Sequence, residues 1–392
     1  MIQFRSFFLV SLLIAFITGS AIIGDQTLDY SVSQRTIVLN KTKQGKTIKI
    51  GLLIPDKEAL AAKHGAELAI RKANEKGGYS GLPFQLVVRS TEGPWGTGSK
   101  ESVSLVFDDE VVAIMGSLDG RNAHLAEQVA TKTKLIFLSA WATDMTLSKA
   151  FVPWYFRCLP NDRQQAISLI QEVYIKRKIK NAAIIGTDNN DSRIAVNTFI
   201  KIAKSMNVGP PEQFLYDASG RNYQEIFKEI EKHGIEAILL FGNPAFASEI
   251  IPLFQQYNIK QPVFGSLSIL DDQKASSPDW SILEDIVVIS SNQWFTGKGI
   301  AFQKEFQTEY GYQPGPAAAY AYDGINVIVE AIRNAKPDRN SIIDDREKII
   351  DVFSKVNYSG ITGRIQFDEV GNRIGKVGLI EILNGHPVVR ND

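Results

Sequence analysis

The sequence predicts an α/β protein with two doubly wound, Rossmann-like lobes, and three observations carry this prediction. Short, nearly all-apolar runs rich in β-branched residues, such as residues 48–54, are typical of buried parallel strands. Segments with helical spacing of apolar residues alternate with these runs. The alternation is interrupted at Pro160-Asn161-Asp162 and then starts again. Two successive series of β-α-β units indicate two parallel sheets with helices on both faces.

The first series occupies residues 48–138. Its predicted strands cover residues 48–54, 84–89, 111–115 and 135–138, and its predicted helices cover 58–74, 102–107 and 121–131. Gly77 and Gly78 end the first helix, as glycine commonly does after a helical C-terminus. The break at Pro160 is therefore expected to mark the passage of the chain into a second lobe.

The second series follows the same pattern, and the tail then departs from it. Helices are predicted at residues 164–176, 194–205, 223–233 and 247–257, and strands at 182–185, 213–216, 237–241 and 263–264. In the tail, helices are predicted at 317–335 and 341–354, followed by strands at 360–368 and 376–382 around a turn at 369–372. These last strands read as a hairpin, and they predict that the chain returns to an earlier sheet.

The N-terminal residues 1–24 are expected to be a signal peptide or a retained N-terminal anchor. A basic start at residues 1–5 precedes an apolar stretch and the small residues Gly19, Ser20 and Ala21, which favours cleavage after Ala21. The apolar stretch continues through Ile22 and Ile23, so an anchor stays open. Residues 25–46 are polar and without periodicity, and we expect a linker there.

The charge balance argues against polyanionic partners. Lysine and arginine together number 43, as do aspartate and glutamate, so no overall field attracts nucleic acid or acidic lipid. The single cysteine, Cys158, cannot form an internal disulfide, and a buried structural thiol is expected there.

Motifs for cofactors, metals and catalysis fail on inspection. The glycine-rich segment 93–100 places Ser99 where a phosphate-binding loop needs lysine, and no G-x-G-x-x-G follows any predicted strand. Residues 188–192 begin like a calcium loop, but Arg193 and Phe199 occupy the positions that require glycine and glutamate. The four histidines lack metal-ligand spacing. We expect no cofactor, no metal and no enzymatic activity.

Two loops that follow predicted strands carry the candidate ligand contacts. Asp119 is placed to cap a helix, and Gly120 next to it allows close approach to free backbone amides, which favour an anion. The loop at residues 139–144 offers hydroxyls, carbonyls and an aromatic wall. The predicted binding residues are Trp95, Asp119, Gly120, Arg121, Trp141, Ala142, Thr143 and Asp191. Ordinary helix capping is the alternative explanation for these loops.

Several stretches stand in a particular order along residues 48–385. They are Ile48-Lys-Ile-Gly-Leu-Leu-Ile54, Gly65-Ala-Glu-Leu-Ala-Ile70 with Asn74 and Gly77-Gly78, residues 111–116, Phe156-Arg157 with Pro160-Asn161-Asp162, Tyr322-Asp323, and residues 358–368 with Gly371-Asn372. In this order and spacing the sequence resembles the leucine/isoleucine/valine-binding proteins, the type I periplasmic solute-binding proteins of ABC importers.

The resemblance implies two lobes with three hinge crossings, which is the periplasmic-binding-protein-like I fold. The first lobe would take residues 47–158 plus 292–356, and the second 159–291 plus 357–392. In such proteins hinge closure buries the ligand between the lobes.

The resemblance also implies roles for individual residues. In that family a serine after the third strand and a threonine after the fourth help to hold the ligand's carboxylate and amine. Thr143 stands at the threonine position, Gly120 at the serine position, and Trp141 where a small residue usually offers its carbonyl. Arg121 is available as a charged partner, and Asp191-Ser192 lies near a common tyrosine–glycine pair. These departures leave the identity of the ligand open.

The function implied by the resemblance is non-enzymatic binding of an amino acid or amide-like solute outside the cytoplasm. The expected partner is an ABC transporter permease, and the expected state is a monomer. A tethered sensing module without a transport role is the second function class. An enzyme is the third class, and it would gain support if His64 or His124 lay within hydrogen-bond reach of Cys158.

Overall fold

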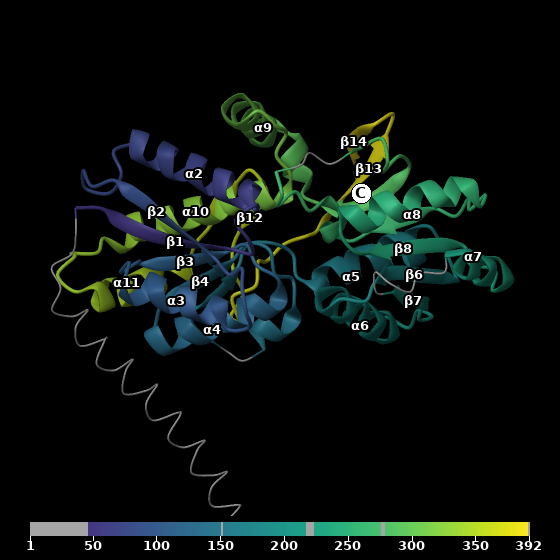
Figure 1. Cartoon of the computed structure of the whole chain (residues 1–392), viewed down its shortest axis with the longest axis horizontal. Coiled ribbons are helices and arrows are strands. Elements are labelled where there is room, and N and C mark those ends of the chain that lie inside the picture. Colours follow the sequence, from purple (N-terminus) through teal and green to yellow (C-terminus); the bar gives the residue numbers. More distant parts are fainter. Residues whose placement is uncertain (1–45, 150–151, 217–222, 276–278, 391–392) are drawn as a thin grey trace, which may run out of the picture.

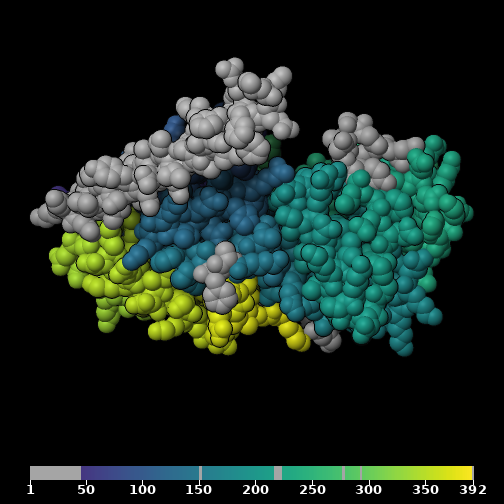
Figure 2. Space-filling model, turned by 90° about the horizontal axis from the view of Figure 1, so that it is seen from below, coloured from purple at the N-terminus to yellow at the C-terminus, as the bar shows by residue number. Residues whose placement is uncertain are grey.

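The computed structural model describes residues 46–149, 152–216, 223–275 and 279–390, which form two α/β lobes side by side (Figure 1). Seen from below, the teal surface of the second lobe abuts the blue surface of the first (Figure 2). The N-terminal segment predicted as signal or anchor and most of the predicted linker lie outside the described residues. Within the described ranges, no helix has both the length and the apolar character that a membrane span requires.

The first lobe contains a five-stranded parallel sheet in the order β2-β1-β3-β4-β5. Its strands are β1 (Ile48–Ile54), β2 (Phe84–Ser90), β3 (Ala113–Gly116), β4 (Ile136–Ser139) and β5 (Tyr155–Arg157). The helices of this lobe are α2 (Leu60–Glu75), α3 (Thr97–Phe107), α4 (Gly120–Thr133), α9 (Gly297–Tyr310), α10 (Pro316–Ala335) and α11 (Ile342–Phe353). Helix α10 packs tightly on α2, because Gly65 carries no side chain: an added Cβ would lie 2.2 Å from the Ala318 carbonyl oxygen.

The second lobe contains a seven-stranded sheet in the order β14-β13-β10-β9-β8-β6-β7. Its strands are β6 (Ala182–Thr187), β7 (Glu212–Tyr216), β8 (Ala237–Phe241), β9 (Val263–Gly265), β10 (Ile286–Ser290), β13 (Gly378–Leu383) and β14 (His386–Val389). The five strands β6 to β10 are parallel to one another, whereas β13 pairs antiparallel with β10 and β14 pairs antiparallel with β13. The helices are α5 (Asp162–Ile170), which continues as the π-helix Gln171–Lys176, α6 (Asn190–Ser205), α7 (Tyr223–Lys232) and α8 (Pro244–Gln256).

The apolar runs form these sheets because each lobe covers its strands on both faces. Every residue of β3, β4, β8 and β10 is buried, which explains why these strands read as continuous apolar runs instead of an alternating pattern. Several helices begin at a side-chain cap; at α5, Asn161 and Gln164 form a reciprocal capping box. The predicted fold class, two doubly wound α/β lobes, is confirmed.

Several elements of the structure were not predicted from the sequence. Strand β5 has only three residues between prolines, and β14 is similarly short. Strand β10 and helix α9 were not predicted either. The β-branched run at residues 286–289 could have indicated β10, and Gly311, directly after α9, could have indicated the end of that helix. Short 3-10 turns lie at Met145–Ser148, Leu267–Leu270 and Asn292–Phe295.

The predicted C-terminal hairpin is wrong in its pairing. The turn at residues 369–372 does form: Gly371 has a φ of 78°, and the Asp368 carboxylate accepts a 2.7 Å bond from the Asn372 amide. Only one antiparallel bridge, between Phe367 and Arg373, flanks it. The predicted strand at 360–368 is instead the hairpin β11 (Tyr358–Gly360) and β12 (Gly363–Ile365). Strand β13 pairs with β10 and β14, so the chain does return to an earlier sheet, through another partner.

The chain passes between the two sheets three times, and hydrogen bonds tie these passages together. They follow β5, β10 and α11. Arg373 donates to the Cys158 carbonyl (2.7 Å) and to the Thr362 carbonyl (2.7 Å), while the Ser291 hydroxyl donates to the same Thr362 carbonyl (2.7 Å). Asp323 of α10 accepts from the Thr362 amide (2.8 Å). The exact lobe boundaries given above stay a prediction.

Candidate functional site

A cavity of about 570 Å³ lies between the lobes. Volumes of roughly 300–1,000 Å³ are usual for sites that enclose a small molecule. The first lobe lines the cavity with loops that follow β1 to β4, and the second with loops that follow β6, β8 and β9 and with the start of α5. The carboxyl ends of parallel strands therefore face each other across the cleft, where doubly wound folds bind ligands.

Six of the eight predicted binding residues line this cavity. They are Trp95, Asp119, Arg121, Trp141, Thr143 and Asp191. Gly120 and Ala142 do not line it. The Gly120 amide donates a hydrogen bond to Asp191. Ala142 is buried, and its carbonyl accepts a hydrogen bond from the Ser139 hydroxyl at 3.4 Å. Contact of any of these residues with a ligand remains a proposal.

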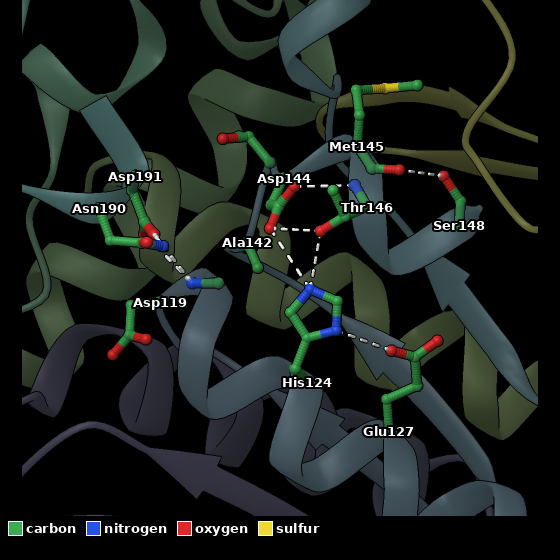
Figure 3. Close-up of polar contacts among 12 residues, drawn as sticks. Asp119, His124, Glu127, Ala142, Asp144, Met145, Thr146, Ser148, Asn190 and Asp191 are labelled. Atoms are coloured by element: carbon green, nitrogen blue, oxygen red, sulfur yellow. Dashed lines mark hydrogen bonds and ion pairs between the residues drawn. The ribbon is translucent and has the colours of Figure 1, made fainter. Parts of the chain in front are cut away.

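Two carboxylates accept hydrogen bonds from backbone amides at the N-terminus of α4. Asp119 caps the helix and accepts from the Asn122 amide at 2.9 Å. Asp191, from α6 of the other lobe, accepts from the Gly120 amide at 3.1 and 3.3 Å (Figure 3). A Cβ at position 120 would lie 3.1 Å from an Asp191 oxygen, so glycine allows this approach.

The loop at residues 141–144 is held from below by Arg157, which is completely buried. Its guanidinium donates to the carbonyls of Thr143 (2.5 Å) and Asp144 (2.6 Å), and its Nε donates to the Tyr155 hydroxyl (2.9 Å). The Thr143 carbonyl also accepts from the Asp162 amide at 3.0 Å. The loop is therefore anchored through its backbone, which leaves the side chains of Trp141 and Thr143 on the cavity wall.

Trp141 is further positioned across the cleft by Gln273. In the amide orientation that satisfies both of its polar atoms, Gln273 accepts from the Trp141 indole at 3.2 Å and donates to the Ser117 carbonyl at 3.2 Å. The Ala61 amide donates to the Gln273 carbonyl at 3.2 Å. Contacts of this kind hold the second-lobe loop at residues 271–273 against the first lobe.

His124 forms a polar cluster behind the cleft, on α4 (Figure 3). Its Nε2 lies 2.8 Å from the Thr146 hydroxyl and 3.4 Å from an Asp144 oxygen, and its Nδ1 lies 3.3 Å from Glu127. Hydrogen bonding to Asp144 and Glu127 raises the pKa of His124 to about 9. Burial acts to raise the pKa of Asp144, but hydrogen bonds from His124 and Thr146 outweigh it and hold that pKa below its usual value.

This cluster predicts a loss of stability at alkaline pH. Because the pKa of His124 in the folded protein lies above its ordinary value of 6.5, the stabilisation is complete below about pH 6.5 and is lost as pH rises through about 9. His124→Gln should remove most of that slope in the free energy of unfolding, measured in urea from pH 6 to pH 10. His233→Gln, an exposed histidine paired to glutamates, is the control. An unchanged slope in His124→Gln would contradict the prediction.

The cleft also contains acidic residues that the sequence analysis did not select. Burial raises the pKa of both Asp162 and Asp271 to about 7, and burial likewise raises the pKa of Asp191. Asp162 is only 4% exposed, and its Oδ2 has no hydrogen-bond partner. Asp162 begins α5 immediately after the predicted break, but nothing local in the sequence shows that it faces the opposite lobe.

Other reactive groups lie elsewhere. Cys158 is buried, its sulfur lies 3.5 Å from the Ser139 carbonyl and 3.6 Å from the Tyr320 carbonyl, and burial raises the pKa of the thiol to about 12. His64 bonds the Tyr312 hydroxyl (3.0 Å) and His124 bonds Thr146, so neither hydrogen bond goes to the thiol. In the part of the chain that the structure describes, no group of three or more His, Cys, Asp or Glu side chains is arranged to hold a metal ion.

Comparison with known proteins places this architecture. The fold is similar to that of the branched-chain amino acid transporter substrate binding protein LivJ from Streptococcus pneumoniae in complex with isoleucine, at 20% identity and a TM-score of 0.73, over 88% of this chain and all of that one. It is also similar to an ABC transporter solute binding protein from R. palustris in complex with benzoate, at 16% identity and a TM-score of 0.73, over 88% of this chain and 95% of that one.

Sequence comparison extends this likeness to larger proteins. Glutamate receptor 3.1 of Oryza sativa subsp. japonica is 22% identical over 314 residues, which are 68% of this chain and 33% of the receptor. The chain spans about a third of the length of the curated receptors that it matches. A family model described as periplasmic binding protein matches residues 47–381, from β1 into β13. Because this match covers most of the chain, including both lobes and the cleft, the chain belongs to the periplasmic binding protein family.

Proposed function

We propose that this protein closes its two lobes over a small polar solute, an amino acid or an amide-like compound, and presents it to an ABC-type permease. The observation that carries the proposal is the cavity of about 570 Å³, which polar and aromatic side chains from both lobes line at the carboxyl ends of their strands. Three passages between the lobes form a hinge about which the cleft can open and close.

The relatives support the class of ligand and the transport role. The similar proteins from Streptococcus pneumoniae and R. palustris are substrate or solute binding proteins of transporters, described with isoleucine and with benzoate. Their ligands differ, so the ligand class comes from the side chains of each cleft. The proposed ligand contacts here are the side chains of Trp95, Asp119, Arg121, Thr143 and Asp191, with Trp141 as an aromatic wall.

The second candidate function is a sensing module that reports occupancy without transport. The similarity to plant glutamate receptors favours it, since in these the matched region is a third of a longer protein. Both functions share the same cleft and the same ligand step. Import of the bound solute by cells that carry the protein, and its loss on deletion, separates transport from sensing.

The remaining expectations follow from the family. We expect the protein outside the cytoplasm, as the description of its family indicates, released or anchored through residues 1–24. A monomer is sufficient, because a single chain supplies both walls of the cleft. We expect no catalysis, since the hydrogen bonds of the Cys158 sulfur go to carbonyls and the pKa of its thiol is raised by burial.

A thermal-shift screen with amino acids, amides, short peptides and sugars tests this function. A ligand at 100 times its dissociation constant should add about 2.7 kcal/mol to the free energy of unfolding. Thr143→Ala should weaken binding of the hit about tenfold, the value of one hydrogen bond to a polar ligand group. Thr308→Ala, on the exposed surface of α9, should bind normally. If nothing in the screen shifts the melting temperature, the proposed ligand class is wrong.

A further inference from the structure

The first backbone amide of helix α4 belongs to Gly120. Helix N-termini attract anions, because their first N–H groups are unpaired and the helix dipole is positive there. Here the protein supplies that anion itself: both oxygens of Asp191 lie within 3.3 Å of the Gly120 amide. Asp191 belongs to the opposite lobe, 71 residues further along the chain, so this bond crosses the cleft (Figure 3). A carboxylate on a ligand would have to displace it.

Most of the other ionisable side chains that line the cavity are acidic. Among the described residues that line the cavity, the acidic side chains are Asp119, Asp162, Asp191 and Asp271, and the basic one is Arg121. Arg121 is exposed. The nearby Asp144 already has a cationic partner in His124, which lies behind the wall and not in it. The cavity lining therefore contains more acidic than basic side chains, and a bound cation would favour the ionised form of the three whose pKa is raised by burial, Asp162, Asp191 and Asp271.

Asp162 is the acidic side chain whose geometry points most directly to a missing partner. It is 96% buried, as its 4% exposure shows, it lines the cavity, and its Oδ2 accepts no hydrogen bond. The Asp162 carboxyl group has a hydrogen bond with the Thr143 side chain and feels the charge of Arg157, but its Oδ2 is left without a donor. A buried acceptor without a donor is costly, and a cation or a strong donor that reaches this oxygen from the cavity would remove that cost. Burial raises the pKa of Asp162, the hydrogen bond with Thr143 and the charge of Arg157 act to lower it, and the charges of Asp144 and Asp191 act to raise it.

Two tryptophans give the cavity surfaces that suit an organic cation. Trp95 is 77% exposed at the loop after β2, and Trp141 is fixed by Gln273 on the loop after β4; both line the cavity. The faces of indole rings attract ammonium and guanidinium groups, by roughly 0.5–2 kcal/mol depending on solvation. Because carboxyl groups and indole faces line the same cavity, the cavity should bind a positively charged ligand more tightly than an anionic one.

We propose that the solute is an organic cation, an amine or amidinium compound with net positive charge, which binds between Asp162 and Asp191 while Asp191 fills the anion-binding amide of Gly120. This inference rests on the proposed function and narrows its ligand class. An amino acid amide or a basic amino acid has the required net positive charge. A neutral zwitterion does not, and its carboxylate would lie against the acidic side chains of the cavity.

Matched ligand sets test the charge requirement by isothermal titration calorimetry. One set is leucinamide, leucine and 4-methylpentanoate, and a second is phenylalaninamide, phenylalanine and 3-phenylpropanoate; cadaverine and agmatine extend the cationic group. In at least one set the amide should bind ten times more tightly than the zwitterion, and the acid should not bind. Asp162→Asn should weaken binding of that amide at least tenfold. Asp188→Asn, at a partly exposed acid that is paired with Arg193 outside the cavity lining, should leave the affinity for that amide unchanged.

A second variant tests the role of Asp191 separately. Asp191→Ala exposes the Gly120 amide, so the zwitterion should gain at least tenfold relative to the amide. Asp191→Asn removes the charge but keeps an acceptor for Gly120, and serves if the alanine variant does not fold. Tighter binding of a zwitterion or an acid to the wild-type protein would overturn this inference and leave the binding function standing. Absence of binding by every compound in these sets, together with no shift in the thermal screen above, would overturn both.

Discussion

Asp323→Ala is expected to lower the free energy of unfolding by about 3–5 kcal/mol, the cost typical of removing one partner from a buried charged network. Asp323 is completely buried and accepts bonds from the amides of Ile361 (2.9 Å) and Thr362 (2.8 Å) and from the Thr362 hydroxyl (2.6 Å). Alanine would leave two buried amides without acceptors. It would also remove the favourable electrostatic interaction between the Asp323 carboxylate and the Arg373 guanidinium. Urea unfolding followed by circular dichroism measures the loss.

The same network explains why this effect should reach the hinge. Thr362 is bonded by Ser291 from the second passage and by Arg373, which also bonds Cys158 in the first passage. Asp323→Asn keeps one acceptor oxygen and should lose about half as much stability. Asp351→Ala, an exposed acid on α11, should stay within about 0.5 kcal/mol of the wild-type protein. Equal losses for Asp323→Ala and Asp351→Ala would contradict the assigned role.

The elements of the fold that the sequence predicted correctly are those whose residue patterns are local, within a single strand or helix. The bounds of strands β1 and β8 coincide with the predicted ones, because burial on both faces makes β8 wholly apolar and β1 apolar except at Lys49. The pairing of β13 with β10 is different in kind. It joins residues such as Ile289 and Leu379, about ninety positions apart, and the neighbouring turn at 369–372 made a local hairpin the simpler interpretation.

In the candidate site, too, the residues marked by local sequence signals could be predicted, and those placed by long-range packing could not. Loops after β3 and β4 could be selected because strand ends and helix caps are local signals, and Thr143 does lie on the cavity wall. Ala142 was included with its neighbours, but the loop alternates: Trp141 and Thr143 line the cavity, and Ala142 is buried between them. Asp162 and Asp271 were missed because they reach the cavity only through the packing of the second lobe against the first. The family resemblance, confirmed by the match over residues 47–381, located the cleft but not its charge.

Arg157→Met is expected to lower the free energy of unfolding by about 3 kcal/mol and to weaken ligand binding at least tenfold. Arg157 lies beneath the cleft with no exposed surface, and its three hydrogen bonds end on Thr143, Asp144 and Tyr155. Methionine fills much of the same volume but donates nothing. The Asp144 carbonyl and the buried Tyr155 hydroxyl would then lose this donor, and the loop that carries Trp141 and Thr143 would lose its anchor.

Two further variants separate loop positioning from general destabilisation. Arg157→Lys keeps the charge but cannot reproduce the planar fork that reaches two carbonyls at once, so it should recover part of the stability and little of the binding. Arg163→Met removes an exposed arginine near the start of α5 and should change neither quantity. If Arg157→Met bound its ligand with wild-type affinity at a temperature where it is fully folded, the loop would not depend on this guanidinium. The loss of stability in Arg157→Met would then come from lost packing around the buried Arg157 side chain. The ligand affinity would have to come from the side chains that line the cavity, independently of this anchor.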